Sequence, residues 1–293
     1  MGGFFNTYPL GCSIADLMNI YLSPHHDDVC FSIGWLAATR GGELVNLFTD
    51  SVHGLNPSAA DAARHSGETN SARRRREDAR FTEAVGLGTH DLDLPDVADG
   101  ADPFDLTAID DEIERLGARL VPYLLDLLPQ DSTPASATLY CPMGVGAHRN
   151  HLSAFWAVRR AYDRLSPRCS VQLYEELPYA SIGWIRQRDV AAMRNALAGH
   201  GLVPMQVPLT PAELQKKLEW ISYYESQHHT PPRPEQFIPA SGDCAGPHEL
   251  VWRLLPMQTN AASTGHMAGG VISGARWSSG NVAYPRQAAL RIG

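Results

Sequence analysis

Two short clusters of polar residues carry the side chains that could do chemistry in this chain. The first is Ser-Pro-His-His-Asp-Asp at residues 23–28, and the second is His-Arg-Asn-His at residues 148–151. Burying several titratable groups without partners is costly, whereas a bound divalent metal would satisfy them. Imidazole together with carboxylate is a ligand set suited to Zn²⁺. The two clusters therefore favour a metal-dependent hydrolase over a chance grouping at the surface.

Each cluster directly follows an apolar run that is typical of a buried strand. These runs cover residues 19–22 and 137–143. Further strands are expected at 43–49, 91–95 and 171–177, and helices at 30–39, 71–85, 109–128, 151–165 and 211–227. Strands separated by helices predict an α/β fold with a mainly parallel sheet and right-handed crossovers. Because ligands bind beyond the carboxyl ends of such strands, both clusters are expected at one edge of the sheet.

Composition narrows the class of protein. The chain has 293 residues, enough for one large α/β domain, and a formal net charge of −8 that argues against broad binding to nucleic acid or anionic membranes. The amino terminus lacks the basic and apolar regions of a signal peptide, and no stretch is long enough for a membrane span. The five cysteines are scattered without a Cys-x-x-Cys pair, so we expect free thiols and a cytoplasmic location.

Other catalytic signatures are absent from the sequence. It has no Gly-x-Ser-x-Gly elbow, no phosphate-binding Gly-x-x-x-x-Gly-Lys-Ser/Thr, no Gly-x-Gly-x-x-Gly after the first strand and no His-Glu-x-x-His. Their absence disfavours serine hydrolases, nucleotide hydrolases and dinucleotide-binding enzymes.

The two clusters carry a family resemblance. Residues 25–28 resemble the His-x-Asp-Asp signature of the PIG-L/LmbE-like zinc deacetylases, in the branch that reads Ser-Pro-His-x-Asp-Asp, and residues 148–151 are similar to the downstream His-x-x-His of that family. Two weaker features agree: Arg74 to Glu77 resembles an Arg-x-x-Glu helix, and the segment from Lys217 to Gln227 resembles a Lys…Tyr-x-Ser-Gln motif. The resemblance implies a Rossmann-like three-layer fold with C-terminal additions.

The resemblance also implies roles for five residues. His25, Asp28 and His151 would bind the metal, which leaves a coordination position for water. Asp27 would be the general base that takes a proton from this water, and His148 would stabilise the oxyanion or help to protonate the leaving amine. Zn²⁺ is the implied cofactor, with other divalent transition metals left open.

Two positions depart from the family pattern. Val29 stands where many members have Glu. Gly146 stands where some members have a tyrosine, two residues before His-x-x-His, that they use at the oxyanion. This donor is therefore missing here or comes from another part of the chain.

Several further residues are weighed against simpler structural roles. Arg74 matches a substrate-contacting arginine of the family, and Asp50 and His53 follow the second strand and could contact substrate hydroxyls, although loop polarity alone explains them equally well. His26 is expected to lie behind the ligands or in the core, and Cys30 to be a small buried hydrophobe. Asp27 and Asp28 could also cap a helix, and His228 and His229 could be a surface pair.

These observations predict a zinc-dependent deacetylase acting on an N-acylated amino sugar or glycoconjugate, with a role in antibiotic biosynthesis suggested only by the family's spread. The predicted organisation is an extension at residues 1–18, a deacetylase domain at 19–260 and a Gly/Ser/Ala-rich tail at 261–293. The expected partner is a small-molecule glycoside, with self-association left open. Three alternatives remain: an amidase of the same family acting on a non-sugar or thiol-conjugate amide, an inactive sugar-binding module, and a structural metal site.

Overall fold

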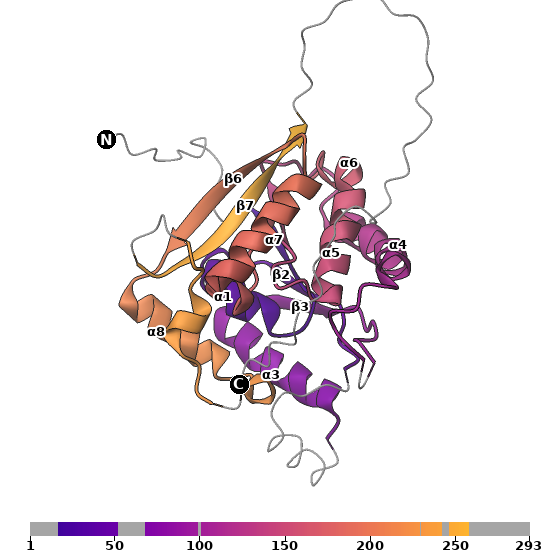
Figure 1. Ribbon diagram of the computed structural model, residues 1–293. Coiled ribbons are helices and arrows are strands. Elements are labelled where there is room, and N and C mark those ends of the chain that lie inside the picture. Colours follow the sequence, from indigo (N-terminus) through magenta and orange to yellow (C-terminus); the bar gives the residue numbers. More distant parts are fainter. Residues whose placement is uncertain (1–16, 52–67, 99–100, 229, 242–245, 258–293) are drawn as a thin grey trace, which may run out of the picture.

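Seven strands form a single sheet in the order β3-β2-β1-β4-β5-β7-β6 (Figure 1). The computed structural model describes residues 17–51, 68–98, 101–228, 230–241 and 246–257. The strands are β1 (Met18–Ser23), β2 (Glu43–Asn46), β3 (Gly88–Asp91), β4 (Ala137–Pro142), β5 (Ser170–Tyr174), β6 (His200–Pro208) and β7 (His248–Met257). The first five are parallel, whereas β7 runs antiparallel to both β5 and β6. The predicted α/β class with a mainly parallel sheet is confirmed.

The order of the strands changes direction between β1 and β4. The chain passes from β1 outward to β2 and β3, then returns to place β4 against the other side of β1. Such a switch point leaves a crevice at the carboxyl ends of the two central strands. The two polar clusters directly follow β1 and β4, so the fold brings them together as predicted.

Helices cover both faces of the sheet (Figure 1). On one face α1 (Asp28–Arg40) contacts α3 (Asn70–Val85) and α8 (Pro211–Ile221). On the other face α4 (Ile109–Leu127) packs against α5 (Arg149–Arg160). The remaining helices are α6 (Tyr162–Leu165), α7 (Gly183–Ala196) and short 3₁₀ turns at Tyr179–Ser181, Glu225–Gln227 and Pro234–Phe237. None of the helices in the described ranges is long and apolar enough to cross a membrane.

Local sequence explains where two of these helices begin. The Thr69 side chain accepts a hydrogen bond from the Ala72 amide at the start of α3. At the start of α8, Thr210 and Glu213 form a capping box around Pro211. Both arrangements satisfy backbone amides that the first turn of a helix leaves without a partner.

A buried ion pair holds α1 against β7, the strand next to the edge strand β6. The helix departs from helical geometry at Ile33, and the Glu249 carboxylate accepts hydrogen bonds from the amides of Trp35 and Leu36 at 2.8 Å each. Lys217 of α8 lies 2.8 Å from Glu249. Glu249 therefore caps the second half of α1 and ties it to the C-terminal part of the sheet.

The structure corrects five of the predicted elements. The strand expected at 43–49 ends at Asn46. The strand expected at 91–95 lies earlier, at Gly88–Asp91, and the helix expected at 151–165 divides into α5 and α6. The helix expected at 211–227 ends at Ile221 and is followed by a separate 3₁₀ turn, while the strand expected at 171–177 ends at Tyr174.

Neither α7 nor the antiparallel pair β6–β7 was predicted from the sequence. Pro204 and Pro208 lie within β6. Prolines disfavour the prediction of a strand, because they cannot donate a backbone hydrogen bond to a neighbouring strand. Because β6 is the edge strand, a proline there does not interrupt a central ladder. The predicted extension and tail lie almost entirely outside the described residues, apart from residues 17 and 18, and β1 begins at Met18.

Candidate metal and catalytic site

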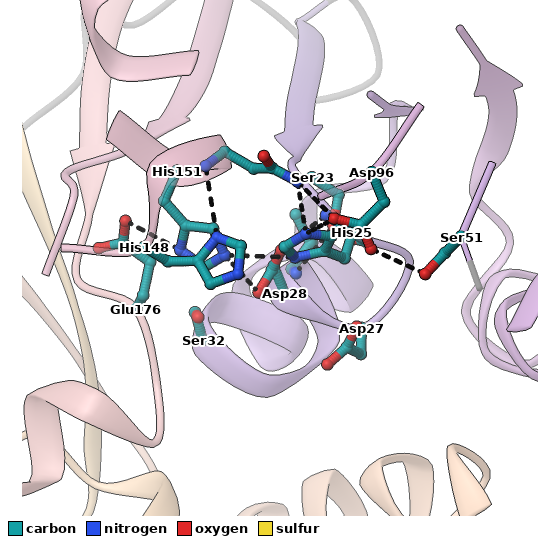
Figure 2. A network of polar contacts seen from close by, with 12 residues as sticks. Ser23, His25, Asp27, Asp28, Ser32, Ser51, Asp96, His148, His151 and Glu176 are labelled. Atoms are coloured by element: carbon teal, nitrogen blue, oxygen red, sulfur yellow. Dashed lines mark hydrogen bonds and ion pairs between the residues drawn. The ribbon is translucent and has the colours of Figure 1, made fainter. Parts of the chain in front are cut away.

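His25, Asp28 and His151 converge at the carboxyl ends of β1 and β4 (Figure 2). His25 Nδ1 lies 3.2 Å from Asp28 Oδ2, and His151 Nε2 lies 3.3 Å from Asp28 Oδ1. The two imidazoles complete the triangle, with His151 Nε2 lying 3.4 Å from His25 Nδ1. All three residues are buried.

The size of this triangle suits a metal ion. Ligand atoms held about 2.0–2.2 Å from a tetrahedral zinc lie about 3.4 Å from one another. The observed separations of 3.2 to 3.4 Å are close to that spacing, with each histidine next to a different oxygen of Asp28. Ring nitrogens of His25, His148 and His151 also gather within 4.8 Å of one another. The triangle with Asp28 is the tighter set and supplies the anionic ligand.

A carboxylate lies behind each of the two histidines. His25 Nε2 lies 3.3 Å from Asp96 Oδ1, and His151 Nδ1 lies 3.5 Å from Glu176 Oε1. Carboxylates in this position fix the tautomer and the orientation of metal-binding imidazoles. Glu176 also accepts hydrogen bonds from the amides of Gly144 and Val145, so the same side chain holds the loop before α5.

The charges at this site favour a bound cation. Burial opposes protonation of His25, but the nearby Asp96 and Asp28 outweigh it and raise the pKa of His25 to about 9. In the same way Asp28, with Glu176, raises the pKa of His151 to about 10 despite its burial. Although burial alone would raise the pKa of Asp28, His151 and His25 hold it well below its ordinary value. The carboxylates therefore create a strongly negative environment that either protons or a divalent cation can neutralise.

Asp27 lies beside the triangle and is held by Arg74 of α3. The Arg74 guanidinium donates to Asp27 Oδ1 at 2.8 Å and to the Ser51 hydroxyl at 3.2 Å. Ser51 in turn donates to Asp96 Oδ2 at 2.7 Å. This network connects the residue next to the metal triangle with the carboxylate behind His25. Asp27 occupies the N-cap position of α1, but its side chain makes no capping hydrogen bond, whereas Asp28 Oδ2 accepts from the His25 amide.

His148 faces the triangle from the start of α5. Its ring lies 4.9 Å from the His25 ring and 5.0 Å from the His151 ring. Its Nδ1 accepts a hydrogen bond from the Asn150 amide at 3.3 Å, which places the proton of the neutral ring on Nε2. Burial, with the positive charges of His25 and His151, holds the pKa of His148 well below its ordinary value.

The remaining predicted residues have varied positions. Asp50 is exposed just beyond β2, and His53 lies outside the described residues. His26 is buried with Nε2 3.6 Å from Asp91 Oδ1, as expected for a residue of the core. Cys30 is fully buried, and burial raises the pKa of its thiol, which fits the predicted structural role. His228 stacks on the Phe31 ring at 5.1 Å instead of standing on the surface, and its neighbour at 229 is not described.

The Arg-x-x-Glu motif of α3 and the Tyr-x-Ser-Gln motif after α8 contact each other. Glu77 of α3 accepts hydrogen bonds from the Ser226 amide and hydroxyl, at 2.9 and 2.6 Å. The Tyr224 hydroxyl donates to Asp78 at 2.9 Å. These contacts attach the segment after α8 to the helix that carries Arg74, so both motifs support the position of the site.

Sequence reasoning missed three residues of this site. Glu176 and Asn150 are buried beside the histidines and Asp96 is partly buried. The side-chain nitrogen Nδ2 of Asn150 lies 3.0 Å from His25 Nε2 and donates to Asp96 Oδ1 at 2.7 Å. Asn150 stands inside the second cluster, and Glu176 follows β5 by two residues. These two positions indicate the correct edge of the sheet, but not which histidine each residue faces.

No family model matches the chain. The 2'-N-acetylparomamine deacetylase of Streptomyces fradiae is 31% identical over 216 residues, which cover 71% of this chain and 72% of that enzyme.

Solved structures of deacetylases share the fold. An A40926 pseudoaglycone deacetylase has a TM-score of 0.58 at 18% identity and covers 83% of this chain and 99% of its own. A deacetylase of teicoplanin biosynthesis, solved with teicoplanin, has a TM-score of 0.59 at 15% identity over 82% of this chain and 99% of its own. These structures show the shared fold, and the identity to the Streptomyces fradiae enzyme shows that the chain belongs to the PIG-L/LmbE-like deacetylase family.

Proposed function

We propose that this protein hydrolyses the N-acyl amide of an amino sugar or glycoconjugate, with N-acetyl as the acyl group and a divalent metal as cofactor. The observation that carries the proposal is the triangle of His25, Asp28 and His151 with Asp27 held beside it by Arg74. Relatives named as deacetylases of paromamine and teicoplanin compounds support an antibiotic-type aminosugar as substrate.

His25, Asp28 and His151 would hold the metal. When bound, it would lower the pKa of a water molecule and polarise the amide carbonyl. Three protein ligands leave room for that water, as in catalytic sites, whereas a structural site is usually closed by four.

The chain's own residues would move the protons. Asp27 would accept a proton from the attacking water as its oxygen bonds to the acyl carbon. As the carbon–nitrogen bond breaks, that proton is passed to the leaving nitrogen, which gives a carboxylic acid and a free amine. The acid then releases its own proton to solvent and becomes a carboxylate. His148 would donate from Nε2 to the carbonyl oxygen as negative charge develops on it.

Arg74 acts in this scheme as a positioning residue. It is buried, and its guanidinium contacts Asp27 and Ser51 and lies 3.7 Å from Asp96. The contact of Arg74 with substrate, and those of Asp50 and His53, stay predictions.

The test measures amine release from a panel of N-acetylated amino sugars, with metal content determined on the same samples. Zinc, manganese, cobalt and nickel are each supplied at one equivalent, because one solved neighbour is described as a zinc-inhibited form. We expect chelator-sensitive release by the native protein and its loss in Asp27→Asn with metal retained. The exposed Glu219→Gln serves as control.

The other outcomes identify the alternatives. Release only from non-sugar amides would indicate an amidase of the same family. Bound metal with no turnover of any amide would indicate a binding module or a structural metal site, and failure to bind any metal would overturn the proposal.

A further inference from the structure

A tyrosine from a different part of the chain occupies the space beside Gly146. Gly146 has a φ of +95°, and a Cβ atom built on it would lie 2.4 Å from Cγ of Tyr179. Real Cβ atoms do not approach other atoms so closely. A side chain at position 146 and the ring of Tyr179 therefore exclude each other.

The backbone on both sides of this contact is held in place. The Gly146 amide donates to the buried Asp189 at 2.8 Å, and Glu176 binds the two preceding amides of the same loop. Tyr179 begins the 3₁₀ turn Tyr179–Ser181, in which the Ala180 amide donates to the Glu176 carbonyl oxygen at 2.8 Å. Glu176 thus organises both the Gly146 loop and the turn that carries Tyr179.

The Tyr179 ring also borders the metal triangle. It packs edge to face on His151, with ring centroids 6.3 Å apart and an interplanar angle of 81°. The side chain is only partly buried. Its hydroxyl makes no hydrogen bond with any residue that the structure describes, so this donor is available to a bound molecule.

From this arrangement we infer that the Tyr179 hydroxyl donates a hydrogen bond to the acyl carbonyl oxygen of the substrate during amide cleavage. The inference rests on the proposed function. The loop before α5 has Gly146 at the position where a tyrosine could donate, and Tyr179 in the turn after β5 would supply that donor instead. No bond to Tyr179 forms or breaks: its O–H donates more strongly as the carbonyl oxygen gains negative charge and returns to its starting state with the products.

The experiment compares Tyr179→Phe with the native enzyme, because this substitution removes the hydroxyl and keeps the ring against Gly146. We expect kcat to fall by about 100-fold, as for loss of one oxyanion donor, with KM within about 3-fold and metal content unchanged. The affinity for a phosphonate analogue of the tetrahedral intermediate should fall in parallel, while that for the amine product stays constant. Tyr123→Phe, on α4, is the matched control.

A crystal structure of the native enzyme with the phosphonate provides a measurement that does not depend on how the variant folds. We expect the Tyr179 hydroxyl within about 3.0 Å of a phosphonate oxygen. An unchanged kcat, an effect on KM alone, or a hydroxyl more than about 4 Å from the analogue would overturn the role of Tyr179 and leave the deacetylase proposal intact. No amine release by the native enzyme would overturn both.

Discussion

Arg74 and Asp27 are 47 residues apart in the chain and form a buried hydrogen bond of 2.8 Å between a guanidinium and a carboxylate. Arg74 lies on α3, and Asp27 lies in the turn between β1 and α1. The contact therefore makes the orientation of the proposed base depend on how α3 packs.

Replacing Arg74 should impair turnover and stability together. We expect Arg74→Ala to lower the free energy of unfolding by about 3–5 kcal/mol, because buried carboxylates lose their countercharge. Arg74→Lys should recover part of that stability but little activity, since an ammonium group does not reproduce the planar fork of donors. Denaturant unfolding and steady-state kinetics measure the two effects.

Arg76 provides the control within the same helix. Its side chain is exposed and pairs with Glu68, so Arg76→Ala should change stability by less than about 1 kcal/mol. Full activity in Arg74→Ala would contradict the positioning role.

The clusters at 25–28 and 148–151 could be predicted because each is a compact local pattern after a recognisable strand. The rule that parallel strands end at one edge was then enough to place them together. Asp96 and Glu176 could not be predicted in this way. Each is an acidic residue in a loop with no recognisable motif around it, and only the three-dimensional course of the chain shows which histidine it faces. The antiparallel β6–β7 pair was missed because edge strands tolerate the prolines that argue against them in sequence.

Asp96 should strengthen metal binding without touching the metal. It lies 3.3 Å from the nitrogen of His25 that faces away from the triangle. We expect Asp96→Asn to weaken metal affinity by about 10- to 100-fold, as for other partners of metal-binding histidines. Competition with a chelator of known affinity measures the change. Asp93→Asn, at an exposed site on the same loop, should bind metal like the native protein, and equal affinities of all three proteins would contradict the prediction.

Lys217 and Glu249 form a buried ion pair in which each charge should offset the cost of burying the other. Both side chains are fully buried, and Lys217 also donates to the Ser32 carbonyl oxygen at 3.0 Å. We expect Lys217→Met to lower the free energy of unfolding by about 3–5 kcal/mol, because it leaves Glu249 charged and unpaired. In the Lys217→Met variant, the further substitution Glu249→Gln should lower the free energy of unfolding by much less than it does in the native protein. The difference between the two effects should give a coupling energy of about 2 kcal/mol.

The neighbouring residue is a matched control for this pair. Lys216 is exposed and pairs with Glu219, so Lys216→Met should change stability by less than about 1 kcal/mol. Strictly additive effects at Lys217 and Glu249 would show that the pair does not act as a unit.

The free energy of unfolding should depend on pH through the titration of Asp78. Burial raises the pKa of this carboxyl from 3.8 to about 6, although His26 and hydrogen bonds from Asn46 and Tyr224 oppose the change. Between these two values the folded state holds a proton that the unfolded state has released. Stability from this group therefore falls as the pH rises from about 4 to above 6, by about 3 kcal/mol in total.

Asp78→Asn removes this titration and isolates its contribution. The native free energy of unfolding minus that of the variant should decrease by about 3 kcal/mol between pH 4 and pH 7. Denaturant unfolding of chelator-treated samples across that range measures the difference and cancels effects of the metal. Asp110→Asn, at an exposed site on α4, is the control for removal of a carboxylate outside the core. A native-minus-variant difference at Asp78 that rises with pH would mean that its carboxylate is stabilised in the fold, with the hydrogen bonds from Asn46 and Tyr224 outweighing burial.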